Sequence, residues 1–301
     1  MKIYPFLKSL LTSPARSRRK WDVKNDLITN TQLNKGIVNI YRKNPNNAGD
    51  LYSAPNNYFK ELGKCEVDIF DFKKREEIDI TRVISDNALI IGGGGLMNRK
   101  SFQMQMETFE ILASRGKKTV LWGVGHNSKY KKDFRKLEHY NINTNGFGLV
   151  GTRDYSLSTS WVPCASCMHP LLDQNYASTR EVGIILHDKT FAKPAITSKF
   201  EEFDIIPNTA DLKSFIQFIG TSENIITNSY HAMYWGILLK KKVTVVPNSS
   251  KFFDFKYDPV FSTFDDCLND YKKSRCYDGV LEDCRQRNLD FAEKVFNYLE
   301  V

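Results

Sequence analysis

One stretch, IITNSYHAMYWGILLKKKVTVVP at residues 225–247, has the pattern of a parallel α/β fold. It begins with a short apolar run, turns at polar residues, continues as an apolar helix and returns through three lysines to a second apolar run. Ser229 is a good N-cap, so His231 is expected in the first helical turn. Free amide N–H groups and the helix dipole favour an anion there and bias an imidazole toward its neutral form. The stretch therefore predicts a site for a phosphate or carboxylate.

The same alternation extends along the chain and predicts an α/β fold with two Rossmann-like domains facing a cleft. Strands are expected at 36–41, 65–70, 88–91, 120–122, 148–152, 182–186 and 205–206, and helices at 51–62, between Ser101 and Gly116, and at 133–140, 210–220 and 280–299. We divide the 301 residues into a basic N-terminal tail (1–34), an N-terminal α/β domain (35–160) and a C-terminal α/β domain (161–301) that carries His231. A ligand is expected in the cleft, at the C-terminal ends of the strands.

The net charge of +8 is concentrated at the N-terminus, where six basic residues precede the first acid. This distribution argues against nucleic-acid binding, which would spread basic groups over a folded face. The apolar and basic residues of 1–20 favour either a segment resting on an anionic membrane surface or a solvated terminus. No apolar run approaches the roughly 20 residues that span a bilayer. Without a secretory signal, a cytoplasmic protein is expected.

The six cysteines are expected to be reduced thiols. Cys164 and Cys167 have CxxC spacing, but a zinc site would usually need a second pair of ligands. A redox CxxC normally opens a helix after a strand, whereas this one follows Trp161-Val162-Pro163. No metal site is predicted.

Several polar side chains follow predicted strands, where α/β folds place ligand contacts. The Arg153 guanidinium could bind a carboxylate or phosphate, and a structural pair with Asp154 is the alternative. Asp50 follows the first strand, either as a carboxylate near the cleft or as a helix cap. His126 and Asn127 follow another strand. Three histidines without a supporting motif are expected to be structural: His139, His169 and His187.

A run of four glycines at residues 92–95 follows a short buried strand. Glycine lets the backbone adopt positive φ and approach a ligand closely. The dinucleotide fingerprint fails three times, because the positions that need glycine hold Met97, Asn98 and Ser128. NAD and FAD are therefore not predicted, and no Gly-Lys-Ser/Thr supports a Walker motif. The glycines are expected to form a tight turn that lines the cleft, or a tight turn only.

In the order of five motifs over about residues 36–250, the chain resembles the polysaccharide pyruvyl transferase family. The motifs are NAGD at 47–50, IIGGGG at 90–95, WGVG at 122–125, TRD at 152–154, and NSYHA at 228–232 followed by VTVVP at 243–247. The resemblance implies a two-domain fold similar to GT-B glycosyltransferases and a phosphoenolpyruvate donor. The implied product is a pyruvate ketal on a sugar of a cell-surface polysaccharide.

The resemblance also implies roles for residues of these motifs. Arg153 would clamp the donor anion, His231 would bind the phosphate or exchange a proton, and Asp50 would do acid–base work on the acceptor. The expected substrate contacts are Asn47, Gly49, Gly92, Gly93, Gly94, Gly95, His126, Asn127, Asn228, Ser229 and Tyr230.

No cofactor or metal is required by this chemistry. The acceptor would be a sugar or a lipid-linked oligosaccharide reached on the inner face of the cytoplasmic membrane. Two alternatives stay open: a GT-B glycosyltransferase that uses a sugar nucleotide, and a non-catalytic carbohydrate- or phosphate-binding protein.

Overall fold

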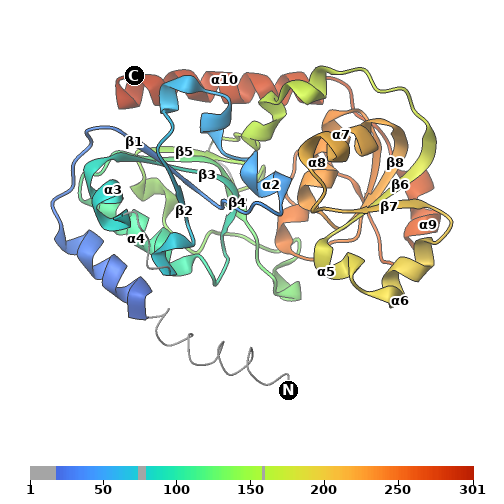
Figure 1. Cartoon of the computed structure of the whole chain (residues 1–301), viewed down its shortest axis with the longest axis horizontal. Coiled ribbons are helices and arrows are strands. Elements are labelled where there is room, and N and C mark those ends of the chain that lie inside the picture. Colours follow the sequence, from blue (N-terminus) through green and yellow to red (C-terminus); the bar gives the residue numbers. More distant parts are fainter. Residues whose placement is uncertain (1–17, 74–78, 158–159) are drawn as a thin grey trace.

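The computed structural model describes residues 18–73, 79–157 and 160–301, and it contains two parallel five-stranded sheets (Figure 1). The mixed α/β class with two parallel sheets, predicted from the alternating pattern, is confirmed. Parallel strands are covered by helices on both faces, which explains why these strands read as continuous apolar runs. The segment 1–20 was predicted to rest on a membrane surface or to be a solvated terminus, and its residues 1–17 lie outside the described residues.

The N-terminal sheet has the strand order β2-β1-β3-β4-β5. Its strands are β1 (Ile37–Tyr41), β2 (Glu66–Asp68), β3 (Ala88–Met97), β4 (Thr119–His126) and β5 (Leu149–Thr152). Helices α2 (Ala48–Leu51), α3 (Ile80–Asp86) and α4 (Gln103–Ser114) connect them. Met106, Phe109 and Leu112 of α4 are fully buried in the core of this sheet, as their spacing predicts.

The C-terminal sheet has the order β10-β9-β8-β6-β7. Its strands are β6 (Arg180–Leu186), β7 (Asp204–Pro207), β8 (Ser222–Thr227), β9 (Lys242–Val245) and β10 (Val260–Phe261). Its helices are α5 (Asp188–Phe191), α6 (Pro194–Thr197), α7 (Leu212–Gly220), α8 (Tyr230–Leu238) and α9 (Cys267–Asp270). Every residue of α8 is buried, because this helix is apolar all round and lies between the sheet and its neighbours.

The last helix, α10 (Val280–Leu299), packs against both sheets. Val280 and Cys284 near its start join the core around α8. Phe291 and Val295 in its second half pack against the N-terminal sheet, over which α10 runs in Figure 1. The predicted C-terminal domain of 161–301 therefore needs correction, since the end of this helix belongs to the core of the N-terminal domain.

The predicted start of the folded body also needs correction. Residues 18–29, placed in the tail by the sequence pattern, form a helix. Leu27 of this helix is fully buried in the N-terminal core, so the folded part begins before residue 35. Among the described residues, no helix combines the length and the apolar character needed to cross a bilayer.

The glycine run at 92–95 lies inside a strand, so the predicted tight turn is wrong. β3 continues through Gly92–Gly95 to Met97, and β4 continues through Gly123 to His126. Gly93, Gly94 and Gly123 have φ of 74°, 90° and 63°, values that glycine adopts at low cost. The register of β3 on β4 shifts between Gly94 and Met97, which is the mark of a bulge that bends a strand.

Two predicted helices are also wrong. The segment 51–62 breaks after α2 into short 3₁₀ turns around Pro55, since proline removes a backbone donor. Over residues 131–140, all of which the structure describes, a single 3₁₀ turn forms at Lys131–Asp133 in place of the predicted helix.

The 3₁₀ helices of the described residues are η1 (Pro55–Asn57), η2 (Lys60–Leu62), η3 (Asp71–Lys73), η4 (Lys131–Asp133), η5 (Thr144–Gly146), η6 (Ala165–Met168), η7 (Pro170–Asp173), η8 (Ser198–Phe200), η9 (Ser250–Phe252) and η10 (Tyr271–Lys273).

Candidate functional site

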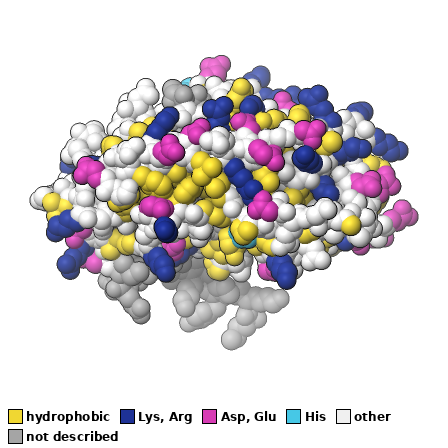
Figure 2. All heavy atoms as spheres, turned by 90° about the horizontal axis from the view of Figure 1, so that it is seen from above, with side chains coloured by type: hydrophobic (Ala, Val, Ile, Leu, Met, Phe, Trp, Pro, Cys, Tyr) yellow, Lys and Arg dark blue, Asp and Glu magenta, His cyan; other side chains and the backbone are white. Residues whose placement is uncertain are grey.

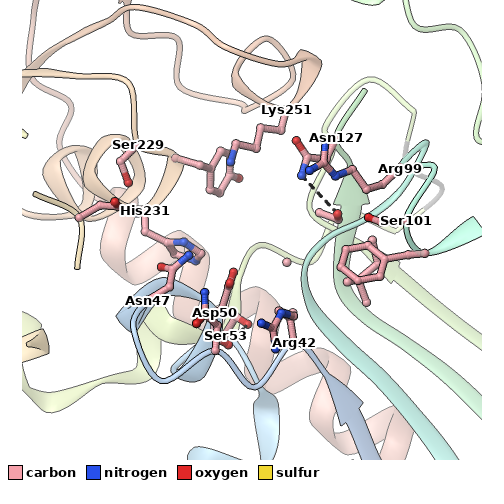
Figure 3. A pocket seen from close by; sticks show the side chains of 18 of the residues that line it. Arg42, Asn47, Asp50, Ser53, Arg99, Ser101, Asn127, Ser229, His231 and Lys251 are labelled. Atoms are coloured by element: carbon pink, nitrogen blue, oxygen red, sulfur yellow. Dashed lines mark hydrogen bonds between the residues drawn. The ribbon is translucent and has the colours of Figure 1, made fainter. Parts of the chain in front are cut away.

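A pocket of about 240 Å³ is lined by residues of both domains (Figure 3). Most of them stand at the carboxyl ends of strands, where parallel α/β sheets bind ligands. The residues that follow or end a strand are Arg42 after β1, Gly93 to Gly95 in β3, Asn127 after β4, Arg153 after β5, His187 after β6, Asn208 after β7 and Ser229 after β8. The pocket thus lies at the carboxyl ends of strands from both sheets.

The structure brings most of the predicted site residues to this pocket. The three expected to be catalytic, His231, Arg153 and Asp50, all line it. The other predicted residues that line it are Asn47, Gly93, Gly94, Gly95, Asn127, Ser229 and Tyr230.

Four predicted contacts do not line this pocket. The side-chain amide of Asn228 is used by the fold, because its oxygen accepts from the His187 backbone N–H and its nitrogen donates to Thr190 Oγ1. His126 lines a separate small cavity, where its Nδ1 lies 2.7 Å from Ser250 Oγ. Gly92 packs against Pro55 and Trp122, and Gly49 packs against His231.

Four cationic residues of the pocket went unnoticed in the sequence: Arg42, Arg99, Lys129 and Lys251. Arg42 directly follows β1, and Lys129 lies three residues after β4. Both could have been identified by their positions after strands, where α/β folds place ligand contacts. Arg99 and Lys251 lie on longer connections, and only the fold shows that they converge. His187, expected to be structural, also lines the pocket.

The pocket is strongly cationic. Among the described residues that line it there are five lysines and arginines, counting Arg153, but only one acid, Asp50. Figure 3 shows Arg42 and Asp50 on one wall, Lys251 and His231 on another, and Arg99 opposite them. On the outer face in Figure 2, by contrast, basic and acidic side chains are interspersed. Within the pocket lining, the charged side chains are instead nearly all positive.

The Arg153 guanidinium is the least satisfied group in the site. Its residue is 2% exposed, and Nε and Nη2 are buried without a hydrogen-bond partner in the described structure. The pair with Asp154 that the sequence left open does not form, since Asp154 Oδ2 accepts from the His126 backbone N–H and from Tyr140 Oη. The Arg153 Cζ lies 4.0 Å from the centre of the Tyr230 ring, which fixes the guanidinium plane. A buried donor of this kind calls for an anionic ligand.

Lys251 titrates close to neutrality. Burial lowers the pKa of its ammonium to about 7, and the positive charges of Lys129 and Arg153 lower it further, against the opposing effect of Asp50. A cationic cluster without a bound anion has this effect, because each charge disfavours the next.

His231 is held as a neutral imidazole. Burial lowers its pKa well below the ordinary value, and the charges of Arg153 and Lys251 act in the same direction. Its Nε2 lies 3.6 Å from Cys164 Sγ, and the Nδ1 edge faces Gly49 of the opposite domain. Ser229 occupies the N-cap position of α8, but its side chain makes no capping hydrogen bond. Ser229 lines the pocket together with Tyr230 and His231 of the first helical turn.

Asp50 differs from the helix cap that the sequence allowed. It lies inside α2, with Asn47 at the N-cap. Burial raises the pKa of the Asp50 carboxyl, although Lys251, Arg42 and Arg153 oppose the shift. The site thus pairs a carboxyl with raised proton affinity and an imidazole with lowered proton affinity, an arrangement suited to proton transfer in opposite directions.

No protein-family model matches the chain, and no curated protein matches its sequence.

Proposed function

We propose that this protein is a polysaccharide pyruvyl transferase, which moves pyruvate from phosphoenolpyruvate to two hydroxyls of a sugar as a ketal. The observation that carries the proposal is the buried Arg153 guanidinium, whose Nε and Nη2 have no hydrogen-bond partner among the described residues, in a pocket lined by four further cations. The motif resemblance supports the same reaction. We further propose that the two domains are arranged as in GT-B enzymes, with the donor between them.

Phosphoenolpyruvate suits the charge and the size of the pocket. Its phosphate and carboxylate together carry roughly three negative charges near pH 7. Arg153 would bind one anionic group bidentately, and Lys251 and Arg42 would approach the other from opposite walls. The pocket volume of about 240 Å³ is below the roughly 300–1,000 Å³ of sites for drug-sized ligands. This favours a small donor.

The reaction adds a sugar hydroxyl across the enol double bond. In our proposal, Asp50 gives its proton to the methylene carbon, and the hydroxyl oxygen forms a bond to the adjacent carbon while its proton passes to His231. The carbon–oxygen bond to phosphate then breaks, with the electron pair leaving on phosphate. A second hydroxyl of the same sugar closes the ketal and gives its proton to the Asp50 carboxylate, and the departing phosphate takes the proton from His231.

The proton affinities of the two groups fit these roles. Burial raises the pKa of the Asp50 carboxyl, which favours the protonated form that the proposed step uses. An imidazole whose pKa is lowered is free to accept a proton. The acceptor is proposed to be a sugar of a lipid-linked oligosaccharide, brought to the pocket at the cytoplasmic face of the membrane.

Phosphate release from phosphoenolpyruvate, assayed with a panel of sugar and lipid-linked acceptors, tests the proposal. Arg153→Gln and His231→Gln should each lower kcat/KM by about 10²-fold or more, because each removes an anion-stabilising or proton-transferring group. Arg82→Gln is the matched control, since the Arg82 side chain is 79% exposed and lies outside the pocket. Near-normal turnover in either pocket variant would exclude that residue from the mechanism.

A GT-B glycosyltransferase that uses a sugar nucleotide is the second candidate. Phe70 and Phe102 line the same pocket and could stack on a nucleobase, and their ring centroids lie 4.9 Å apart. Thermal shift separates the two candidates, with phosphoenolpyruvate in one arm and a panel of nucleotide sugars in the other. Stabilisation by nucleotide sugars alone would favour the glycosyltransferase.

A further inference from the structure

A second cluster of polar residues lies beside the pocket and across the boundary between the domains. His126 ends β4, Asp154 follows β5, and Asp254 lies between β9 and β10. His126 Nε2 lies 3.8 Å from Asp154 Oδ1 and 3.6 Å from Asp254 Oδ2, and the three atoms lie within 4.8 Å of one another. The side chains are 3%, 1% and 10% exposed in that order.

The remaining polar atoms of these side chains are held by hydrogen bonds. His126 Nδ1 lies 2.7 Å from Ser250 Oγ, and Asp154 Oδ2 accepts from the His126 backbone N–H at 2.7 Å. Asp254 Oδ1 accepts from the Ser156 backbone N–H, also at 2.7 Å. Outer partners of this kind orient metal ligands in proteins. They leave one nitrogen and two oxygens within 4.8 Å of one another.

The charges of the cluster call for a cation. Two nearly buried carboxylates face each other, and in the described part of the chain neither forms an ion pair with a lysine or arginine. Holding both ionised without a compensating charge is costly. Separations of 3.6 and 3.8 Å exceed a hydrogen bond. They match the roughly 3–4 Å between two ligands that each lie about 2.0–2.2 Å from one metal ion.

We propose that His126, Asp154 and Asp254 bind a divalent transition-metal ion, Mn²⁺ or Zn²⁺. One imidazole and two carboxylates form a mixed nitrogen and oxygen set, which suits these ions better than Ca²⁺ or Mg²⁺. A cavity of about 50 Å³ adjoins the cluster; its lining includes His126, Ser250 and Asp254, together with Asp133, Arg135, Leu137, Ser156 and Phe253. It has room for a water that completes the coordination.

The ion would connect the two domains. His126 and Asp154 belong to the N-terminal sheet, whereas Asp254 and Ser250 come from the C-terminal domain. Arg153 directly precedes Asp154, so an ion held there fixes the backbone that carries the guanidinium into the pocket. Its role is structural, and it takes no part in the proposed reaction. The inference does not depend on the identity of the substrate.

Metal binding can be measured without any substrate. Full-length protein stripped with a chelator should bind about one equivalent of Mn²⁺, and its Tm should rise by at least about 3 °C at saturating ion. Mn²⁺ is the better probe, because the six free cysteines can take up Zn²⁺ nonspecifically. Absence of both stoichiometric binding and a Tm rise in the wild-type protein would overturn the proposal.

Variants of the cluster test the assignment of the ligands. Asp254→Asn keeps an acceptor for the Ser156 N–H but loses the ligand charge, so Mn²⁺ binding should be lost. Ser250→Ala should weaken binding about 10- to 100-fold, because the hydroxyl orients His126. Asp258→Asn, four residues further along the same connection, is the control and should bind as the wild type does. Wild-type affinity in both Asp254→Asn and Ser250→Ala would place the ion elsewhere.

Discussion

Arg42 and Lys251 can each present a positive charge to a ligand. Arg42 is already paired with an acid, whereas the charge of Lys251 depends on pH. Arg42 is committed to an ion pair with Asp68 and rests on the Phe70 ring at 4.5 Å. Among the described residues no acid forms an ion pair with Lys251, and burial among cations lowers the pKa of its ammonium to about 7 against the opposing charge of Asp50. The affinity of the pocket for an anion should therefore depend on pH through Lys251.

The sign of this dependence follows from linkage. An anion prefers the protonated lysine, so its affinity is highest below about pH 7 and falls as pH rises through the pKa of the free protein. Phosphoenolpyruvate is fully ionised above about pH 7, so the donor itself contributes no change there. Titration calorimetry should show Kd rising above about pH 7, toward about tenfold per pH unit.

Lys251→Met should bind the donor more weakly at low pH and show a flatter profile. Lys199→Met removes the same charge from a lysine that pairs with Asp265 outside the pocket, and it should keep the wild-type profile. A donor affinity of the wild-type protein that stays constant between about pH 7 and 9 would rule out this role for Lys251.

At the scale of elements, the first turn of α2 and the first turn of α8 fit against each other. A Cβ at Gly49 would lie 2.0 Å from His231 Nδ1, a distance that no side chain tolerates. The glycine of the NAGD motif is thus required by a histidine 182 positions later in the chain. A side chain at position 49 would therefore force His231 to move.

Gly49→Ala should displace His231 while leaving the two sheets intact. A shift of about 1 Å in a catalytic group can cost on the order of 10²-fold in rate, and kcat/KM should fall by about that factor. Gly146→Ala is the control, because its Cβ would meet only Glu110 Cγ, at 3.9 Å. Full activity of Gly49→Ala would show that the imidazole position is not important for turnover.

The sequence predicts elements well where periodicity is the dominant signal. The segments expected at 182–186 and 280–299 appear as β6 and α10 because their apolar spacing is set by burial. The glycine run at 92–95 misled the prediction, since glycine usually breaks strands. Here β3, which contains Gly93 and Gly94, pairs in parallel with β4, and the register between the two strands shifts after Gly94. Tertiary pairing outweighed the local preference of glycine.

The site was predictable only in part, because tertiary packing rather than local sequence pattern brings some of its residues to the pocket. Arg153 and Asn127 stand directly after strands, and His231 starts a helix, so local pattern was enough to select them. Lys251 and Arg99 reach the pocket from connections whose course depends on packing between the domains. No spacing within the sequence brings these two residues together.

At the scale of the whole molecule, α10 joins the two cores. Trp122 Nε1 of β4 donates to Asn288 Oδ1 at 2.9 Å, and the Asn288 nitrogen donates to the carbonyl oxygens of Pro163 and Cys284. The Phe291 ring lies 5.2 Å from the Trp122 ring, nearly perpendicular to it. Loss of contacts on this helix should weaken both domains.

Phe291→Ala should lower the free energy of unfolding by about 3–5 kcal/mol, because it leaves a cavity between α10 and the N-terminal sheet. Leu289→Ala, on the same helix but 43% exposed, should stay within about 0.5 kcal/mol of the wild type. Urea denaturation followed by circular dichroism measures both. Equal stabilities of the two variants would show that this face of α10 contributes little.

The return of the last helix to the first sheet also limits how the gene can be divided. A cut after residue 160 would give an N-terminal fragment whose β-sheet no longer packs against α10. In the other fragment, half of the apolar face of α10 would be exposed to water. Neither piece would be a self-sufficient folding unit, and each would be prone to aggregate when expressed alone. Co-expressed, the two should reassemble as a split protein, with the helix of the second fragment as the recognition segment.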